Sequence, residues 1–273
     1  FPYTTLFRSV GDVLGRTPGC LQAVERVHGH FPESRFEHVR GQRRQSRDGA
    51  DAGDPSVAAN TPPTTIDRTP KLRAPTAAAP LKLWVGGDSI SYEPGIGLQN
   101  LSSTTKLLTM DKPDARASTG LTRPDYFNWP DHLLRDVTPL NGGGLDPDVL
   151  VIMFGGNDDQ NIPAFNGKPA YVAGTPEWQA EYRQRVGDTM DLLKSKDNDR
   201  LIVWVGAPIM TPGRLKHIGQ MDYIYATEAA KRPWVKYLDS WPFFTDPDAH
   251  SPVSATFYKS AIRTSVNGRR MLK

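Results

Sequence analysis

Four short apolar runs, each closed by small or turn-forming residues, stand out in the part of the chain beyond residue 80. They predict buried β-strands over Leu81–Val85, Pro147–Phe154, Leu201–Val205 and Trp234–Leu238. The first two runs end in a glycine pair, and the third ends in Gly206-Ala207-Pro208. Apolar runs without alternation are typical of strands in a parallel sheet that is covered on both faces.

Helical patterns lie between these runs. Thr175-Pro176-Glu177 supplies an N-cap, a proline at the first helical position and an acidic residue, and apolar residues then recur at helical spacing as far as Leu193. Weaker patterns predict helices over Tyr223–Lys231 and, interrupted by Pro130, over Tyr126–Val137. Strands that alternate with helices predict an α/β domain with a mostly parallel sheet. In such sheets the functional site lies at the carboxyl ends of the strands.

Residues 1–80 have a different composition and predict no folded domain. A polar, basic stretch at Gln42–Arg47 precedes Asn60–Pro80, which is rich in Thr, Pro and Ala and predicts a disordered tail and linker. Residues 1–9 resemble the translation of a sequencing adapter, which indicates an assembly artefact; the alternative is an ordinary disordered tail. We therefore expect the folded domain to span residues 81–273.

Charge and cysteine content exclude several classes of protein. The net charge of +3 arises within residues 1–80, which hold 11 basic against 8 acidic residues, whereas residues 81–273 hold 22 of each. A neutral domain argues against a nucleic-acid-binding face. The single cysteine, Cys20, excludes a disulfide framework or a cysteine-based zinc site. The chain carries no intact signal peptide and no apolar run long enough to span a membrane.

Two of the predicted strands end in residues that could carry chemistry. Gly87-Asp88-Ser89 follows the first strand and Gly155-Gly156-Asn157-Asp158 follows the second. Each motif alone could be an ordinary turn, because Gly, Asp, Asn and Ser all favour turns. With the intervening segment Ser118–Asp125 (STGLTRPD), however, the chain resembles the SGNH, or GDSL, hydrolase family, in particular a bacterial branch of exported or membrane-anchored proteins.

The resemblance implies a three-layer, flavodoxin-like domain that contains a serine nucleophile. Ser89 would attack an ester carbonyl, and the backbone N–H groups of Ser89 and Gly120 and the side-chain amide of Asn157 would hold the oxyanion. It also implies an extracytoplasmic location and, as substrate, a small ester or the O-acyl group of an envelope glycan. No cofactor and no metal is expected, because no His or second acidic cluster joins Asp158 and Asp159 at useful spacing.

The catalytic base is the open question. The family places an Asp-x-x-His near its C-terminus, and the chain contains none. In one interpretation His250 is the base, oriented by Asp248 or Asp246. In another, Asn267-Gly268 marks a hairpin that precedes the missing block, and the chain ends short of its base. A third possibility is an inactive domain that binds glycans or serves in assembly, and O-acyl transfer is an alternative to hydrolysis.

Four other residues are secondary candidates. Arg123 and Asp125 would line the substrate pocket or form a local ion pair that fixes the loop. His132 falls in a predicted helix, where packing or surface exposure is the common role. His217 lies among Arg214, Lys216 and Gln220, which favours a solvated helix start. Oligomeric state is not predicted.

Overall fold

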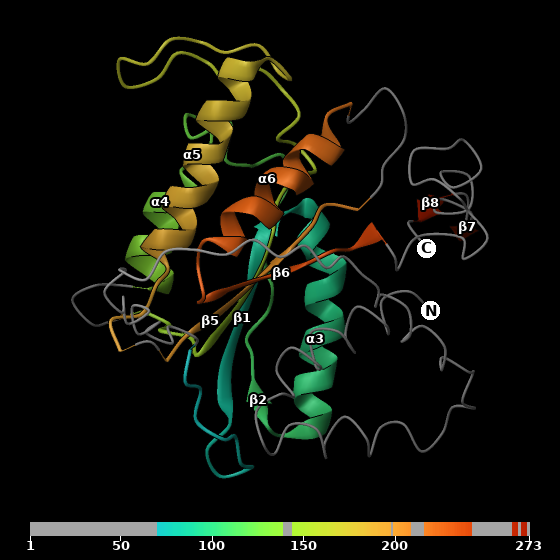
Figure 1. Ribbon diagram of the computed structural model, residues 1–273. Coiled ribbons are helices and arrows are strands. Elements are labelled where there is room, and N and C mark those ends of the chain that lie inside the picture. Colours follow the sequence, from blue (N-terminus) through green and yellow to red (C-terminus); the bar gives the residue numbers. More distant parts are fainter. Residues whose placement is uncertain are drawn as a thin grey trace, which may run out of the picture.

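The computed structural model describes residues 70–138, 144–197, 199–208 and 216–241, together with the backbone of residues 264–266 and 269–271. Within these ranges a six-stranded sheet has the order β2-β1-β4-β5-β6, with β3 also paired to β1 (Figure 1). Its strands are β1 (Leu81–Asp88), β2 (Leu108–Thr109), β3 (Asp114–Arg116), β4 (Val149–Met153), β5 (Leu201–Val205) and β6 (Val235–Leu238). Every pairing in the sheet is parallel. The predicted α/β class with a mostly parallel sheet is therefore confirmed, and the strand order is flavodoxin-like.

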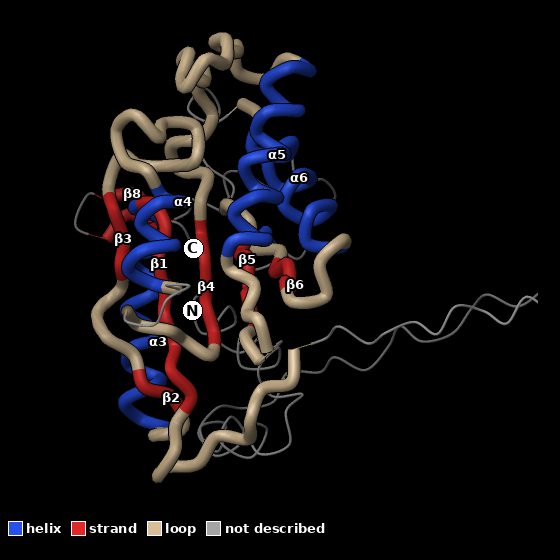
Figure 2. The backbone as a smooth tube through the Cα atoms, turned by 90° about the vertical axis from the view of Figure 1, so that its left-hand side faces the viewer, coloured by secondary structure: helices blue, strands red, loops and turns tan. Residues whose placement is uncertain are grey.

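Helices cover both faces of this sheet (Figures 1 and 2). They are α3 (Tyr92–Thr105), which follows the short 3₁₀ turn η2 (Ser89–Ser91), α4 (Trp129–His132) with its π-helical continuation η3 (Leu133–Val137), α5 (Pro176–Leu192) and α6 (Ile218–Ala230). Leu98 of α3 packs on one face with Val85 and Val151, and the remaining helices pack on the other face. Three layers result, as expected.

The start of α5 follows from its local sequence. The Thr175 hydroxyl accepts from the Trp178 N–H at 3.3 Å, and Pro176 occupies a first-turn position where its missing N–H costs nothing. The predicted apolar positions of this helix, Trp178, Tyr182, Val186, Met190 and Leu193, are all fully buried. This predicted helix is confirmed.

Two predicted helices have different bounds in the structure. The one expected at Tyr223–Lys231 begins five residues earlier, at Ile218, because polar residues in its first turn hide the apolar pattern. The one expected at Tyr126–Val137 begins only at Trp129. Its N-cap, Asn128, accepts from the Asp131 N–H at 3.2 Å, so that Pro130 falls in the first turn and interrupts nothing.

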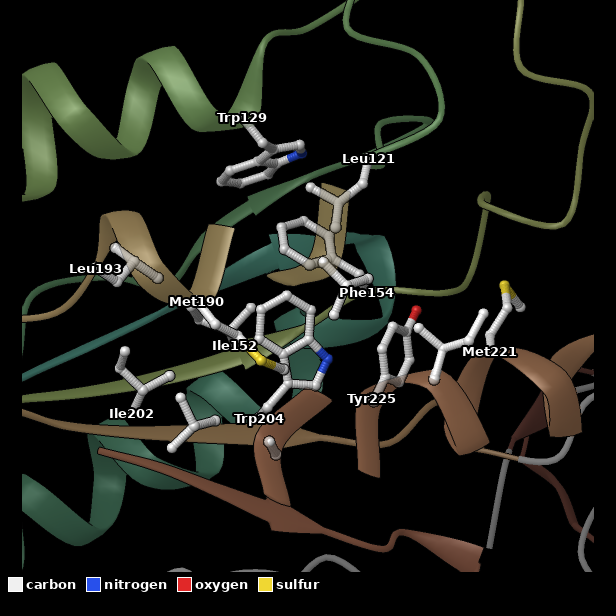
Figure 3. Close-up of a cluster of buried hydrophobic side chains, with 14 of the residues drawn as sticks. Leu121, Trp129, Ile152, Phe154, Met190, Leu193, Ile202, Trp204, Met221 and Tyr225 are labelled. Carbon is white, nitrogen blue, oxygen red and sulfur yellow. The ribbon is translucent and has the colours of Figure 1, made fainter. Parts of the chain in front are cut away.

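The larger core lies on the face covered by α4, α5 and α6 and contains a row of aromatic rings (Figure 3). Phe154, directly after β4, contacts Trp129 with ring centroids 5.2 Å apart and Trp204 at 5.7 Å, and Trp204 contacts Tyr225 at 5.5 Å. Edge and tilted contacts of this kind stabilise aromatic cores beyond simple burial. The row ends at the carboxyl edge of the sheet, so the candidate motifs lie directly above a packed aromatic core.

Two segments at the ends of the chain bear on the predicted domain limits. Leu72 packs partly buried against the core, and Arg73 pairs with Asp148 at 3.3 Å, so contacts with the domain begin before residue 81. Near the other end, β7 (Thr264–Val266) pairs with β8 (Arg269–Met271) in antiparallel fashion. The strands on either side of the hairpin predicted at Asn267-Gly268 are thus paired, whereas these two residues lie outside the described ones.

Candidate active site

Ser89 stands exposed where β1 gives way to η2. The preceding Asp88 caps this turn: its Oδ1 accepts from the Ile90 N–H at 2.9 Å, and its carbonyl accepts from the Ser91 hydroxyl at 2.7 Å. Gly87 has φ +143°, and a Cβ there would lie 1.9 Å from the Met153 carbonyl oxygen of the neighbouring strand. Only glycine allows β1 to approach β4 so closely before the serine.

The turn after β4 is bonded directly to the turn after β1. The N–H groups of Gly155 and Gly156 donate to Oδ2 of Asp88 at 3.0 and 2.7 Å. Gly155 has φ +122°, and a Cβ at this position would lie 2.6 Å from that of Ala207. Asn157, which follows this turn, is therefore fixed in relation to the turn that carries Ser89.

The loop that carries Gly120 is bonded to the same turn. The side-chain amide of Asn157 donates to the Thr119 carbonyl at 3.1 Å, and Asp158 accepts from the Thr122 N–H at 3.0 Å. A Cβ on Gly120 would lie 2.1 Å from Asp158 Oδ1. The three predicted motifs thus meet at one edge of the sheet.

The orientation of one peptide within this loop affects its chemistry. The described residues contain no cis peptide bond. In a trans peptide the carbonyl and the following N–H point in opposite directions. Because the Thr119 carbonyl faces the Asn157 amide, the Gly120 N–H points away from that amide.

The stems of the glycine loop are anchored in the core. The Trp129 indole N–H donates to the Thr119 hydroxyl at 2.9 Å, and that hydroxyl donates to the Arg116 carbonyl at 2.7 Å. His132 lies between two carboxylates, with Nε2 2.6 Å from Asp114 and Nδ1 2.7 Å from Asp136. Both ring nitrogens of His132 therefore contact carboxylates, at the base of the loop.

Burial dominates the electrostatics beneath this edge. It raises the pKa of Asp88 from 3.8 to about 7, against the lowering effect of the bond from Ile90, and the neighbouring Asp158 raises it further. Burial likewise raises the pKa of Asp158, although bonds from Thr122 and Tyr182 oppose it. The Tyr182 hydroxyl donates to Asp158 at 2.7 Å and lies 2.6 Å from the Tyr225 hydroxyl.

The secondary candidates are placed as follows. Arg123 and Asp125 form an ion pair at 2.8 Å at the surface of the glycine loop. His217 does lie at a helix start, as the cap of α6, but it is not simply solvated: its Nδ1 is 2.7 Å from Asp159 Oδ1, and Asp159 Oδ2 accepts from its backbone N–H at 2.8 Å. Asp246, Asp248 and His250 lie outside the described residues.

Three carboxylates near the site were not assigned a role from the sequence. Asp88 and Asp158 are part of the motifs themselves, and the structure shows them accepting hydrogen bonds from the turns and loop of the site. Asp159 was paired with a histidine 58 residues away, which no local pattern indicates. A signal existed only for Asp88, since an aspartate after a strand and before a helix is a typical N-cap.

The described residues contain neither a candidate membrane span nor a candidate metal cluster. None of their helices is long and apolar enough to cross a membrane. Nor does this part of the chain contain a group of three or more His, Cys, Asp or Glu side chains that could hold a metal ion.

The fold and the strand-end site define a three-layer α/β protein with a flavodoxin-like parallel sheet. Within that class, the chain belongs to the family described as "Protein of unknown function (DUF459)", whose model matches residues 82–256. No curated protein matches the chain.

Solved structures similar to this chain include an SGNH-hydrolase family esterase, AlinE4 (16% identity, 67% of this chain and 92% of that one, TM-score 0.41). Another is a carbohydrate esterase family 2 enzyme with a carbohydrate-binding domain from Corynascus thermopiles (Myceliophthora fergusii) (16% identity, 70% and 65%, TM-score 0.42). A third is a putative platelet activating factor from Streptococcus pneumonia (17% identity, 71% and 77%, TM-score 0.42).

Proposed function

We propose that the protein is a serine esterase that acts on an O-acyl ester through an acyl-enzyme. The observation that carries the proposal is the convergence of three turns, through the bonds from Gly155 and Gly156 to Asp88 and from Asn157 to Thr119. These bonds bring an exposed serine, a glycine loop and a carboxamide to one sheet edge. Acyl transfer requires that combination of a nucleophile and neutral donors.

In the proposed reaction the Ser89 oxygen forms a bond to the ester carbonyl carbon while a base removes the hydroxyl proton. The tetrahedral intermediate then expels the alcohol, which takes up that proton, and leaves an acyl-serine. Water adds to the acyl-serine and releases the carboxylic acid and free Ser89. An acceptor hydroxyl in place of water would give acyl transfer instead.

The oxyanion would be held by the Ser89 N–H and by the N–H of Asn157 that is not bonded to Thr119. For the Gly120 N–H to join them, the Thr119–Gly120 peptide would have to rotate on substrate binding. Such a rotation takes the residue after the peptide to positive φ, which glycine accepts without a steric penalty. Each donor of this kind contributes about 3 kcal/mol of transition-state stabilisation.

We assign the base to His250, oriented by Asp248 or Asp246, or to a histidine beyond Lys273. The substrate would be the O-acyl group of an envelope glycan or a small ester, which implies an extracytoplasmic location. Arg123 and Asp125 would contact the substrate at the rim.

An activated-serine probe tests the nucleophile. A fluorophosphonate should label the chain and fail to label the Ser89→Ala variant, whereas Ser103→Ala, which alters an exposed serine of α3, is the matched control that keeps labelling. The chain should turn over nitrophenyl acetate weakly or not at all if the base lies beyond Lys273. Clear turnover that is lost in His250→Ala would assign the base to His250. Absence of labelling, both here and in a chain extended beyond Lys273, would favour a glycan-binding module.

A further inference from the structure

Two buried carboxylates lie directly beneath the candidate site, and the proposed reaction gives neither of them a step. Asp88 is fully buried. One of its oxygens accepts from Ile90 in the serine turn, and the other accepts from Gly155 and Gly156 in the turn before Asn157. A single side chain therefore ties two of the three segments of the site together.

Asp158 ties the third segment to the body of the protein. It is also fully buried, and its Oδ1 accepts from both the N–H and the hydroxyl of Thr122, at 3.0 and 3.1 Å. Its Oδ2 accepts from the Tyr182 hydroxyl of α5, which in turn contacts the Tyr225 hydroxyl of α6. The carboxylate also occupies the space next to Gly120 that a Cβ would need.

The donors to these carboxylates are all uncharged. Asp88 is bonded to three backbone N–H groups, and Asp158 to backbone and hydroxyl groups. Within the described residues, no Lys, Arg or His side chain pairs with either carboxylate. Bonds from N–H to an ionised acceptor are short and strong, but burying an uncompensated charge destabilises the fold. The two buried carboxylates therefore hold these loops in place and at the same time lower the stability of the fold.

We propose that Asp88 and Asp158 are positioning residues that hold the Ser89 turn, the Gly120 loop and the Asn157 amide in the geometry that acyl transfer needs. The inference rests on the proposed function. An asparagine cannot replace either residue fully, because its amide nitrogen would face the N–H groups or hydroxyls that now donate to an oxygen. Each substitution would release one segment of the site without removing the nucleophile or a donor.

The test compares three buried aspartates in the full chain. Asp88→Asn and Asp158→Asn should each lower kcat for nitrophenyl acetate by at least about tenfold with KM changed less than about threefold, since small misplacements of donors affect the transition state. The matched control is Asp222→Asn. Asp222 is a buried residue of α6 and accepts from the N–H of Ala207, just beyond β5, at 2.8 Å, but it bonds to none of the three segments. It should keep kcat within about twofold. Equal losses of kcat in all three variants would overturn the proposal.

A second measurement does not depend on turnover. In the ¹⁵N-labelled chain, amide exchange at Gly155 and Gly156 should accelerate at least about tenfold in Asp88→Asn, and exchange at Thr122 should accelerate in Asp158→Asn, while core amides of β5 stay unchanged. If neither this chain nor a chain extended beyond Lys273 shows turnover or serine labelling, the proposed function fails. Unchanged local exchange would then overturn the positioning inference separately.

A milder variant covers the case in which an aspartate variant does not fold. Tyr182→Phe removes only the hydroxyl that donates to Asp158 and keeps the buried ring. It should lower kcat severalfold with KM unchanged and accelerate exchange at Thr122. Its control, Tyr223→Phe, alters a hydroxyl on an exposed side chain of α6 and should change neither. No difference between the two variants in either measurement would contradict the role of Asp158.

Discussion

Buried carboxylates occur in two regions of the molecule with opposite electrostatics. At the carboxyl edge of β1 and β4, Asp88 and Asp158 receive bonds from neutral donors, and burial raises the pKa of both. On the outer helices, burial also acts on Glu181 and Glu228, but bonds from Lys and Arg side chains outweigh it and lower the pKa of both. The outer pairs stabilise the ionised form, whereas the edge pair holds loops at a cost in stability.

Among substitutions at the carboxyl edge of β1 and β4, Gly120→Ala should have the largest effect on activity. The added Cβ would lie 2.1 Å from Asp158 Oδ1 in a fully buried site, and it would oppose rotation of the preceding peptide. We expect kcat for nitrophenyl acetate to fall by about 100-fold or more. Gly219→Ala is the control, because its Cβ would meet nothing closer than Trp241 at 3.7 Å. Full activity of Gly120→Ala would contradict the assignment of this loop.

The pH dependence of stability sharpens the comparison. Asp88 has an ordinary pKa of 3.8 and a folded-state pKa of about 7, so the folded state binds the proton more tightly than the unfolded state. Raising the pH through this window therefore lowers the free energy of unfolding, by about 4 kcal/mol from this group. Asp158 and Tyr225 are the titratable groups that interact with it.

Asp88→Asn should remove that slope. Urea unfolding at pH 4, 5.5, 7 and 8 gives the free energy of unfolding of the wild type and of the variant. The difference between the two isolates the contribution of Asp88, because the contributions of other titrating groups cancel. Below pH 4 the difference should level off, since Asp88 is then protonated in both states. A difference that stays constant from pH 4 to pH 8 would show that Asp88 is not the group that titrates.

Removing an ion pair from the outer helices should change the free energy of unfolding with the opposite pH dependence and by a smaller amount. Glu228 accepts from Lys231 at 2.6 Å, Arg232 at 2.9 Å and Arg183 at 3.2 Å. Glu228→Gln should lower the free energy of unfolding by about 2 kcal/mol at pH 7, less than for a fully buried pair because Lys231 is solvated. The loss should shrink as pH falls below the ordinary pKa of 4.5 and then through the lowered pKa of Glu228 in the folded state. Glu177→Gln, on an exposed residue, is the control for chemical denaturation.

The smallest effect on stability is expected at the Arg123–Asp125 ion pair on the surface of the glycine loop. The hydrogen bond from Arg123 lowers the pKa of Asp125, but both side chains are more than one-third exposed. Asp125→Asn should therefore change the free energy of unfolding by less than about 1 kcal/mol, and 1 M salt should erase the difference. A raised KM at unchanged stability would support a contact with substrate, whereas unchanged KM would leave Asp125 as a local ion pair.

The sequence was most informative where apolar runs and caps coincide. All four predicted strands and the helix after Thr175 are present, because each is specified by local residues that pack on both faces of the sheet. Strands β2 and β3 are only two and three residues long and leave no pattern to detect. Helix α3 contains Pro94, Gly95 and Gly97, and its close packing, with Gly95 against Pro113, overrides weak helix propensity.

The candidate site was predictable to the level of its motifs but not of its contacts. Ser89, Gly120 and Asn157 followed from placement at strand ends and from family resemblance. The bond from Asn157 to Thr119 and the pairing of His217 with Asp159 span 38 and 58 residues. Such pairs depend on how the loops cross above the sheet, which composition and periodicity do not encode.

The orientation of the Thr119 carbonyl has a consequence for selectivity. A protein whose third donor turns inward only when an acyl group arrives would be inactive toward water in the absence of an ester. The energy needed to rotate the Thr119–Gly120 peptide, rather than the shape of a rigid pocket, would then decide which esters are cleaved.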